Sequence, residues 1–408
     1  MSIGQGVKKQ TRIARQSAKG TLALVGGGQI LRRTQSTFEL AKATYTTETE
    51  INSSQQLTAN RHGERTINGK VAALLSPGAY ADPLSAVLRR DFTAITAISA
   101  ATLTIAGSGP TWTIGRAAGS YLTDGIKIGH VIRLTAGGFN AANLNKNLLV
   151  TAVSALSITV QLVTASLAGL VAEGPISAAT LSVPGKVTFT PATGHTNIYY
   201  TVEEWYPDVP SSERNQDCKV ASVDITMPGS GNCTLNLNML GLDQSTGTTA
   251  YFTAPAVEST SANLVGASGV LVYNGAAIAT ITNVTLKIDG KEAVANAAVG
   301  SVVRPDVFRG KVVVSGSLTA YFDSTTLPDQ FRAEVPASAV LVMASGALAN
   351  SDFLAITIPQ FDLNSSTPMD GETGMTRTYN IQAEYYAAGG AGQTFEQTTI
   401  YLQDSLAP

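Results

Sequence analysis

Charged side chains are scarce in this sequence: they make up 14% of its 408 residues, against 44% hydrophobic residues. Only Cys218 and Cys233 are present, which excludes a disulfide-stapled secreted scaffold and favours two free thiols. No apolar run reaches the 18 residues of a membrane-spanning helix, and the basic, polar N-terminus lacks the apolar core of a Sec signal peptide. Low charge with many small and β-branched residues indicates an all-β chain whose surface is partly covered by partners.

Catalytic and metal-binding motifs are missing as well. The three histidines, His62, His130 and His195, are isolated and form no HExxH or CxxC-associated arrangement. No Walker A loop, GxSxG elbow or DxDxDG calcium loop occurs. Adjacent Glu203 and Glu204 could suggest glycoside hydrolysis, but neighbouring residues of a strand point to opposite faces and cannot act on one bond. The sequence therefore predicts a protein that is not an enzyme and has no cofactor or metal.

Acidic residues are absent from the first 38 positions. Removing the seven basic residues of this segment leaves 27 − 7 = 20 basic against 29 acidic residues, a balance of −9 for the remainder. A basic arm on an acidic body could bind nucleic acid or dock on the acidic surface of an identical neighbour. Because the arm lacks interleaved aromatic residues, we favour the contact between subunits. The residues expected to make it are Lys8, Lys9, Arg12, Arg15, Lys19, Arg32 and Arg33.

Strict alternation of apolar and small polar residues is clearest in residues 219–241. Two such runs flank the turn at residues 228–231, which predicts a β-hairpin with one apolar and one polar face. The pattern recurs in residues 277–290 and 311–323, and we interpret it as duplication of a two-strand unit. The polar faces of the four strands carry Ser222, Asp224, Thr226, Thr234, Asn236, Asn238, Asn283, Thr285, Asp289, Ser315, Ser317 and Thr319.

Such faces of small polar side chains with little charge suit a wall better than a pocket. If identical subunits placed these strands side by side in a ring, the polar faces would line a closed pore, and closure would remove exposed strand edges. The alternative is an ordinary β-sandwich in which one face of the sheet is exposed to solvent.

Three segments are expected along the chain. Residues 1–91 hold the extended arm, a long aperiodic polar loop over 37–69, and the start of the main domain, including a helix over 81–90 capped by Asp82. Residues 92–185 contain short strands between Gly-rich or Asn-rich turns, which predicts an inserted small β-sandwich or barrel. Residues 186–408 form the main β domain, with a helix over 327–334 and a loop over 364–374.

Several stretches resemble the major tail tube proteins of long-tailed, siphovirus-type bacteriophages and related prophages. The similar stretches are GVKKQTRIARQSAKGTLA, GHVIRLTAGGFNAANLNKNLLV, YTVEEWYPDV and RPDVFRGKVVVSGSLTAYF. The resemblance implies stacked rings, usually of six subunits, whose inner hairpins join into a β-barrel that carries phage DNA into the host. The polar residues above would face the lumen, where acidic Asp224 and Asp289 suit DNA passage, while Lys287 departs from that pattern.

The resemblance also implies partners and a location. The basic arm and residues 37–69 would bridge subunits, and the insert would decorate the outside. The protein would assemble in the host bacterial cytoplasm into the virion tail, with tape-measure, terminator and baseplate or tip proteins. DNA would pass without specific binding. A second hypothesis, from another class, is a phage or bacterial surface adhesin that binds host glycans through residues 92–185.

Overall fold

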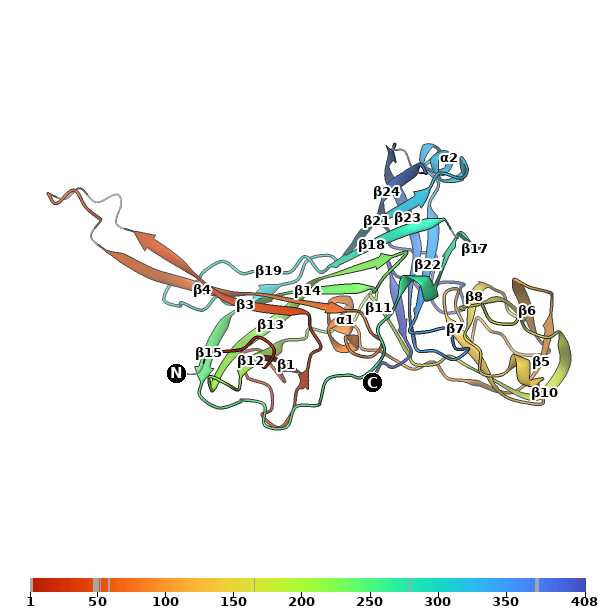
Figure 1. The fold of residues 1–408 in the computed structure, drawn as a ribbon, viewed down its shortest axis with the longest axis horizontal. Coiled ribbons are helices and arrows are strands. Elements are labelled where there is room, and N and C mark those ends of the chain that lie inside the picture. Colours follow the sequence, from red (N-terminus) through yellow and green to blue (C-terminus); the bar gives the residue numbers. More distant parts are fainter. Residues whose placement is uncertain are drawn as a thin grey trace.

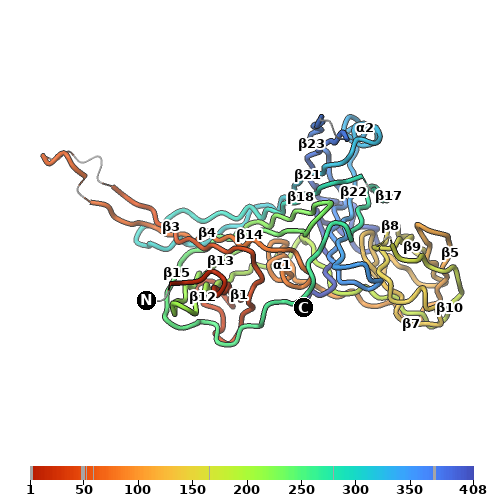
Figure 2. Tube along the Cα trace, in the orientation of Figure 1, coloured from red at the N-terminus to blue at the C-terminus, as the bar shows by residue number. Residues whose placement is uncertain are grey.

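The computed structural model of the protein describes residues 3–46, 51, 53–57, 59–164, 166–278, 280–370 and 374–408. Within these ranges the regular structure is nearly all strand, with two eight-residue α-helices, so the predicted all-β class is confirmed (Figures 1 and 2). Neither α-helix of the described ranges is long and apolar enough to cross a membrane.

A twisted antiparallel sheet of eight strands runs through the middle of the molecule (Figure 1). Its apolar face packs on the main hydrophobic core. In spatial order the strands are β3 (Gln35–Thr46), β4 (Asn60–Leu74), β14 (Thr234–Gly241), β13 (Ser211–Pro228), β18 (Ile281–Asp289), β21 (Val313–Tyr321), β24 (Thr376–Ala383) and β23 (Phe353–Met369).

Two smaller groups of strands back this sheet. The first half of β13 pairs with β12 and β15, and β12 continues to β1 and β2. The first half of β23 pairs in the same way with β22 and β25, and β22 continues to β16 and β17. These strands are β1 (Gln10–Arg15), β2 (Gln29–Ile30), β12 (Tyr200–Tyr206), β15 (Asp243–Gly247), β16 (Gly269–Tyr273), β17 (Ala276–Ala277), β22 (Ala337–Ala344) and β25 (Tyr401–Asp404).

The pairings repeat one arrangement twice along the chain. The first copy orders its sheet strands β3-β4-β14-β13 and the second β18-β21-β24-β23, which is the same order of first, second, fourth and third strand. The helix after the second strand contacts the third strand in both copies: α1 (Ala81–Leu88) contacts β13, and α2 (Thr326–Ala333) contacts β23. Register shifts interrupt both long strands midway, before Ser222 and before Ser365. The fold is therefore a tandem duplication.

The predicted two-strand repeat is consequently wrong in its boundaries. By topology β18 and β21 correspond to β3 and β4, while β13 and β14 correspond to β23 and β24. All eight strands alternate because all bury one face in the same core, so periodicity alone cannot tell which strands are equivalent.

Two predicted loops are also wrong over much of their length, because residues 37–46, 60–69 and 364–369 form strands. Residues 37–46 and 60–69 belong to the two strands of a long hairpin that pairs from Gln35 opposite Ala72 to Thr46 opposite Asn60 and projects from the body (Figure 1). Its outer half has no buried face and so lacks the alternation that marks a half-buried strand. Residues 364–369 extend β23 against β24. The expected loop residues 47–50, 52, 58 and 371–373 lie outside the described residues.

The helix over 81–90 is confirmed, although Asp82 is not its cap. Tyr80 holds the N-cap position, and Asp82 lies in the first turn, where its Oδ1 accepts a hydrogen bond from Arg15 Nε at 2.5 Å. Cys218 and Cys233 are free and buried. They do not face one another across the hairpin, because Cys218 lies beside Gly241 at one end and Cys233 precedes Thr234 at the other.

A separate closed barrel lies between α1 and β12 in the sequence, where the second copy has only a short connection. It has its own hydrophobic core and falls within the expected insert. Gln403 of β25 anchors it: Oε1 accepts from the Val131 N–H at 2.8 Å, and Nε2 donates to the carbonyls of Val131 and Pro184 at 2.9 and 2.8 Å. Its strands are β5 (Ile98–Ala106), β6 (Thr111–Arg116), β7 (Val131–Ala136), β8 (Leu148–Val153), β9 (Ser157–Leu162) and β10 (Glu173–Ser182).

The buried carboxylate of Asp404 predicts a pH-dependent stability. Burial raises the pKa of Asp404 to about 6, although the N–H groups of Gly78 and Leu406 hydrogen-bond to it. Because the folded-state pKa lies above the unfolded value, the stabilisation by this group is complete below pH 4 and is lost as the pH rises through 6. The parent therefore loses stability on going from pH 4 to pH 7, whereas Asp404→Asn lacks the titrating group. The difference in free energy of unfolding, variant minus parent, should increase by about 2–3 kcal/mol from pH 4 to pH 7. Denaturant unfolding at both pH values measures this, and an equal difference at both would contradict it.

Candidate functional site: a polar sheet face

The twelve polar residues expected from the sequence lie together on one face of four adjacent strands, β14, β13, β18 and β21. Across the strands, Asp224 lies opposite both Asn236 and Lys287, and Thr285 lies opposite both Thr226 and Ser317. Adjacent strands in register keep equivalent residues on one side of a sheet. The four strands thus present one continuous polar surface, which we call the polar face.

Burial differs sharply between the two sides of these strands. Eleven of the twelve polar residues are half-buried and Ser222 is buried, as expected of short side chains standing on a sheet. The alternating apolar residues lie in the main core: Val223, Ile225, Leu235, Leu237, Val284, Leu286, Ile288, Val314 and Leu318. One side therefore holds the fold together, and the other is free to meet a partner.

Hydrogen bonds between side chains join neighbouring strands across the polar face. Asn238 Nδ2 donates to Ser222 Oγ at 2.9 Å and to Asp224 Oδ2 at 3.1 Å. Thr285 Oγ1 and Ser317 Oγ are 2.7 Å apart. These short side chains hydrogen-bond to each other along the sheet, and none of the twelve polar residues is long or apolar.

Three charged residues lie on the polar face, and two of them pair. Lys287 Nζ is 3.8 Å from Asp289 Oδ2, and Lys291 Nζ at the strand end is 3.0 Å from the same oxygen. Partial burial would raise the pKa of Asp289, but the Lys291 N–H and the two ammonium groups lower it below its usual value. Asp289 is therefore ionised at neutral pH. With Asp224, the four strands carry two carboxylates and one ammonium group, a charge of −1.

The polar face extends beyond the strands that the sequence singled out. On one side β24 adds Thr378, Asn380 and Gln382, and Thr378 Oγ1 is 2.9 Å from Thr319 Oγ1. On the other side β4 adds Lys70, opposite Asn238. The alternation in TRTYNIQA, residues 376–383, was the available signal for β24.

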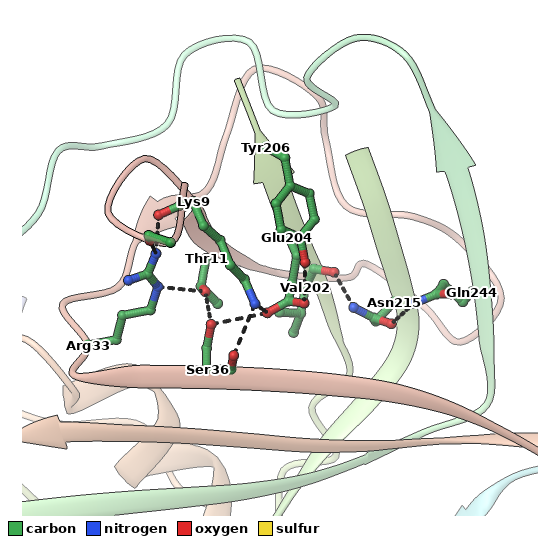
Figure 3. A network of polar contacts seen from close by, with 10 residues as sticks. Lys9, Thr11, Arg33, Ser36, Val202, Glu204, Tyr206, Asn215 and Gln244 are labelled. Carbon is green, nitrogen blue, oxygen red and sulfur yellow. Dashed lines mark hydrogen bonds and ion pairs between the residues drawn. The ribbon is translucent and has the colours of Figure 1, made fainter. Parts of the chain in front are cut away.

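Most of the basic N-terminal residues contact their own chain. Lys9 Nζ is 2.5 Å from Glu204 Oε1, in a network that also holds Ser36 and Arg33 (Figure 3). Arg12 Nη1 is 3.2 Å from the buried carboxylate of Glu203. Glu203 and Glu204 thus point to different partners, in agreement with their adjacent positions on β12.

The remaining basic residues divide between internal contacts and solvent. Lys8 is exposed on the surface. Arg15 pairs with Asp91 as well as Asp82, Lys19 donates to the Pro305 carbonyl, and Arg32 donates to Asn263 Oδ1. A role between subunits stays a prediction for this set.

In the part of the chain that the structure describes, no three His, Cys, Asp or Glu side chains gather to hold a metal ion. His130 is buried at the barrel junction beside Tyr401, with ring centroids 5.6 Å apart, and burial lowers its pKa to about 3. This histidine is neutral and packed in the protein interior.

Comparison with known proteins identifies the family. The model of a family described as phage tail tube protein matches residues 8–383. A search of curated protein sequences gave no match. The family match spans the insert and most of both copies of the duplicated fold. The chain therefore belongs to the phage tail tube protein family, and it is a structural component of the virion tail that assembles with itself into a tube.

Proposed function

We propose that the chains form stacked rings in which the polar faces line a continuous channel, and that this channel delivers phage DNA into the host. One observation carries this proposal: a continuous face of short hydroxyl, amide and carboxylate groups backed by the main core. Such a wall offers no apolar patch to the bases and few cations to the phosphates.

The charges of the polar face suit transport better than binding. A protein grips DNA when Lys and Arg neutralise phosphates and release counterions. Here Lys287 is held beside Asp289, Lys70 on β4 adds one ammonium group, and Asp224 adds one carboxylate. A wall whose few cations are balanced by carboxylates lets DNA pass without holding it.

The projecting β3–β4 hairpin is the proposed bridge between subunits and rings. Apolar Tyr45, Ile51 and Leu57 near its end are 57%, 103% and 51% exposed. Exposed apolar side chains grouped on a projection favour a protein contact. Tape-measure, terminator and baseplate or tip proteins are the further partners proposed for a siphovirus-type tail, assembled in the host cytoplasm.

The inserted barrel carries a second candidate function, glycan binding on the outside of the tube. A groove of about 430 Å³ on it is lined by polar groups that can hydrogen-bond to sugar hydroxyls, including Ser99, Arg116, Thr123 and Asp124. Glycan-array binding that disappears when residues 94–184 are deleted would favour this function. Binding that survives the deletion would exclude the barrel as its source.

Electron microscopy of the concentrated protein tests the main proposal. We expect rings or tubes with a central channel, and a uniform population of monomers would contradict it. Replacing residues 43–63 by a short turn should abolish stacking, because it removes the projecting half of the β3–β4 hairpin and leaves the strands that pack on the core. The control is Ser108→Ala, a single exposed position on the inserted barrel, which should leave tubes unchanged.

A further inference from the structure

The eight-strand sheet ends in two strands with free edges. β3 forms one end and pairs with β4, and the second half of β23 forms the other end and pairs with β24. Among the described residues, neither strand has a neighbour on its outer side in this region. Thr37, Glu39 and Thr367 on these edges are exposed. Unpaired strand edges are prone to uncontrolled association, so two long unpaired edges indicate that each pairs with a specific partner strand.

The junction between the two copies shows how such edges fit together. The second half of β13, the last sheet strand of the first copy, pairs with β18, the first sheet strand of the second copy. Ser222 lies opposite Asp289, Asp224 opposite Lys287, and Thr226 opposite Thr285. The strand equivalent to β13 is β23, and the strand equivalent to β18 is β3. The free edge of β23 is therefore equivalent to the edge by which β13 pairs with β18, and the free edge of β3 is equivalent to the edge by which β18 pairs with β13.

Matched residues place the two copies in a common register. Ser222 faces Asn238 in the first copy, and Ser365 faces Asn380 in the second, each just after the register shift. On the next strands across the sheet, Asn238 lies opposite Lys70, and Lys70 lies opposite Thr37. In the second copy, Asn380 lies opposite Ser317, and Ser317 lies opposite Thr285. The chain therefore carries the same residue type at three equivalent positions, in the pairs Ser222 and Ser365, Asn238 and Asn380, and Thr37 and Thr285.

We propose that β23 of one chain pairs with β3 of the next chain in the register of the internal junction. This inference rests on the proposed ring assembly and specifies its interface. Transferring the internal register places Ser365 opposite Ala41 of the partner subunit, Thr367 opposite Glu39 of the partner subunit, and Met369 opposite Thr37 of the partner subunit. The polar face then continues across the boundary between chains.

Strand direction agrees with this closure. Each of the seven neighbouring pairs in the sheet is antiparallel, so the first and eighth strands run in opposite directions. β23 therefore meets β3 of the next chain antiparallel, as β13 meets β18 within the chain. Pro368 lies on this edge strand, and a proline there discourages pairing with unrelated strands because it has no N–H to donate.

The strand count points to three chains in each ring. With strands about 4.8 Å apart and tilted about 40°, the backbone radius of a barrel is about 16 Å for 16 strands, about 24 Å for 24 and about 32 Å for 32. Side chains make the lumen narrower than the backbone radius, so the lumen of a two-chain ring would be about as narrow as the DNA duplex itself. Three chains leave room for its hydration and counterions, and a fourth would only widen the gap. Six copies of the four-strand unit would then surround the channel, two from each chain.

Paired cysteines test the interface and the count together. Glu39→Cys with Thr367→Cys should form disulfides between neighbouring chains in assembled tubes, because directly opposed residues of antiparallel strands have the required separation. Under non-reducing denaturing electrophoresis we expect covalent species that end at three chains. Asp224→Cys with Lys287→Cys is the matched control, since these equivalent residues should link within one chain. Glu39→Cys with Ser366→Cys should not link, because Ser366 points to the opposite face.

The outcomes separate this inference from the proposed function. Tubes seen by electron microscopy without links between positions 39 and 367 would overturn the edge pairing while the tube remained. A covalent series that ends at six chains would overturn the count of three. Absence of rings and tubes in the parent protein would instead overturn the proposed function.

Discussion

Reversing the charge of the polar face should leave tube assembly intact and reduce DNA delivery. The double variant Asp224→Lys with Asp289→Lys changes the charge of each chain's four strands from −1 to +3. Lysines on the channel wall would bind phosphates through counterion release, so we expect infectivity to fall by at least roughly tenfold at low salt and to recover partly at high salt. Both residues lie on the polar face away from the main core, so the fold should tolerate the change.

The matched controls separate charge from position. Asp224→Asn with Asp289→Asn removes the carboxylates without adding cations, and it should have a much smaller effect. Glu258→Lys with Asp323→Lys makes the same change of charge at two exposed residues outside these four strands. Tubes that form normally and deliver DNA at the parental rate with all three variants would argue against a lumenal polar face.

Arg12→Ala should lower the free energy of unfolding of the unassembled chain by about 3–5 kcal/mol, because it leaves a buried carboxylate without its cation. Glu203 is fully buried, and it also accepts hydrogen bonds from Ser212 Oγ at 2.7 Å and from the Phe252 N–H at 3.2 Å. Those donors remain in the variant, but they do not neutralise the charge. Denaturant unfolding at a concentration below that of assembly measures the loss.

A second substitution identifies the cause of this loss. Adding Glu203→Gln to Arg12→Ala removes the buried charge, and the single amide oxygen can take the place of Glu203 Oε1, which accepts from Ser212 Oγ and the Tyr251 N–H. The double variant should therefore be more stable than Arg12→Ala alone. Lys8→Ala, at an exposed position, should change stability by less than about 0.5 kcal/mol. If Arg12→Ala weakened tubes and left the single chain unaffected, the residue would act between subunits, as its place in a basic arm suggests.

The polar face was predictable because its signal is local. Residues 219–241 alternate strictly, and a half-buried strand requires that alternation, so Asp224 and Asn236 were assigned to one side without any tertiary information. Residues 37–69 escaped the same reasoning because the outer half of the β3–β4 hairpin buries neither face. The partners of the basic residues in the arm could not be predicted for a different reason. Glu203 and Asp82, which pair with Arg12 and Arg15, are distant from them in the sequence.

The amino-acid sequence by itself determined the all-β class, the two-faced strands and the weakly charged surface they share, because each depends on side-chain order within a single strand. Only the tertiary structure decided which strands are neighbours. Strand pairing is a long-range choice, and eight strands with the same alternation satisfy the core equally well in many orders. Pairing revealed that β13 corresponds to β23 and β18 to β3, and thereby exposed both the duplication and the two free edges.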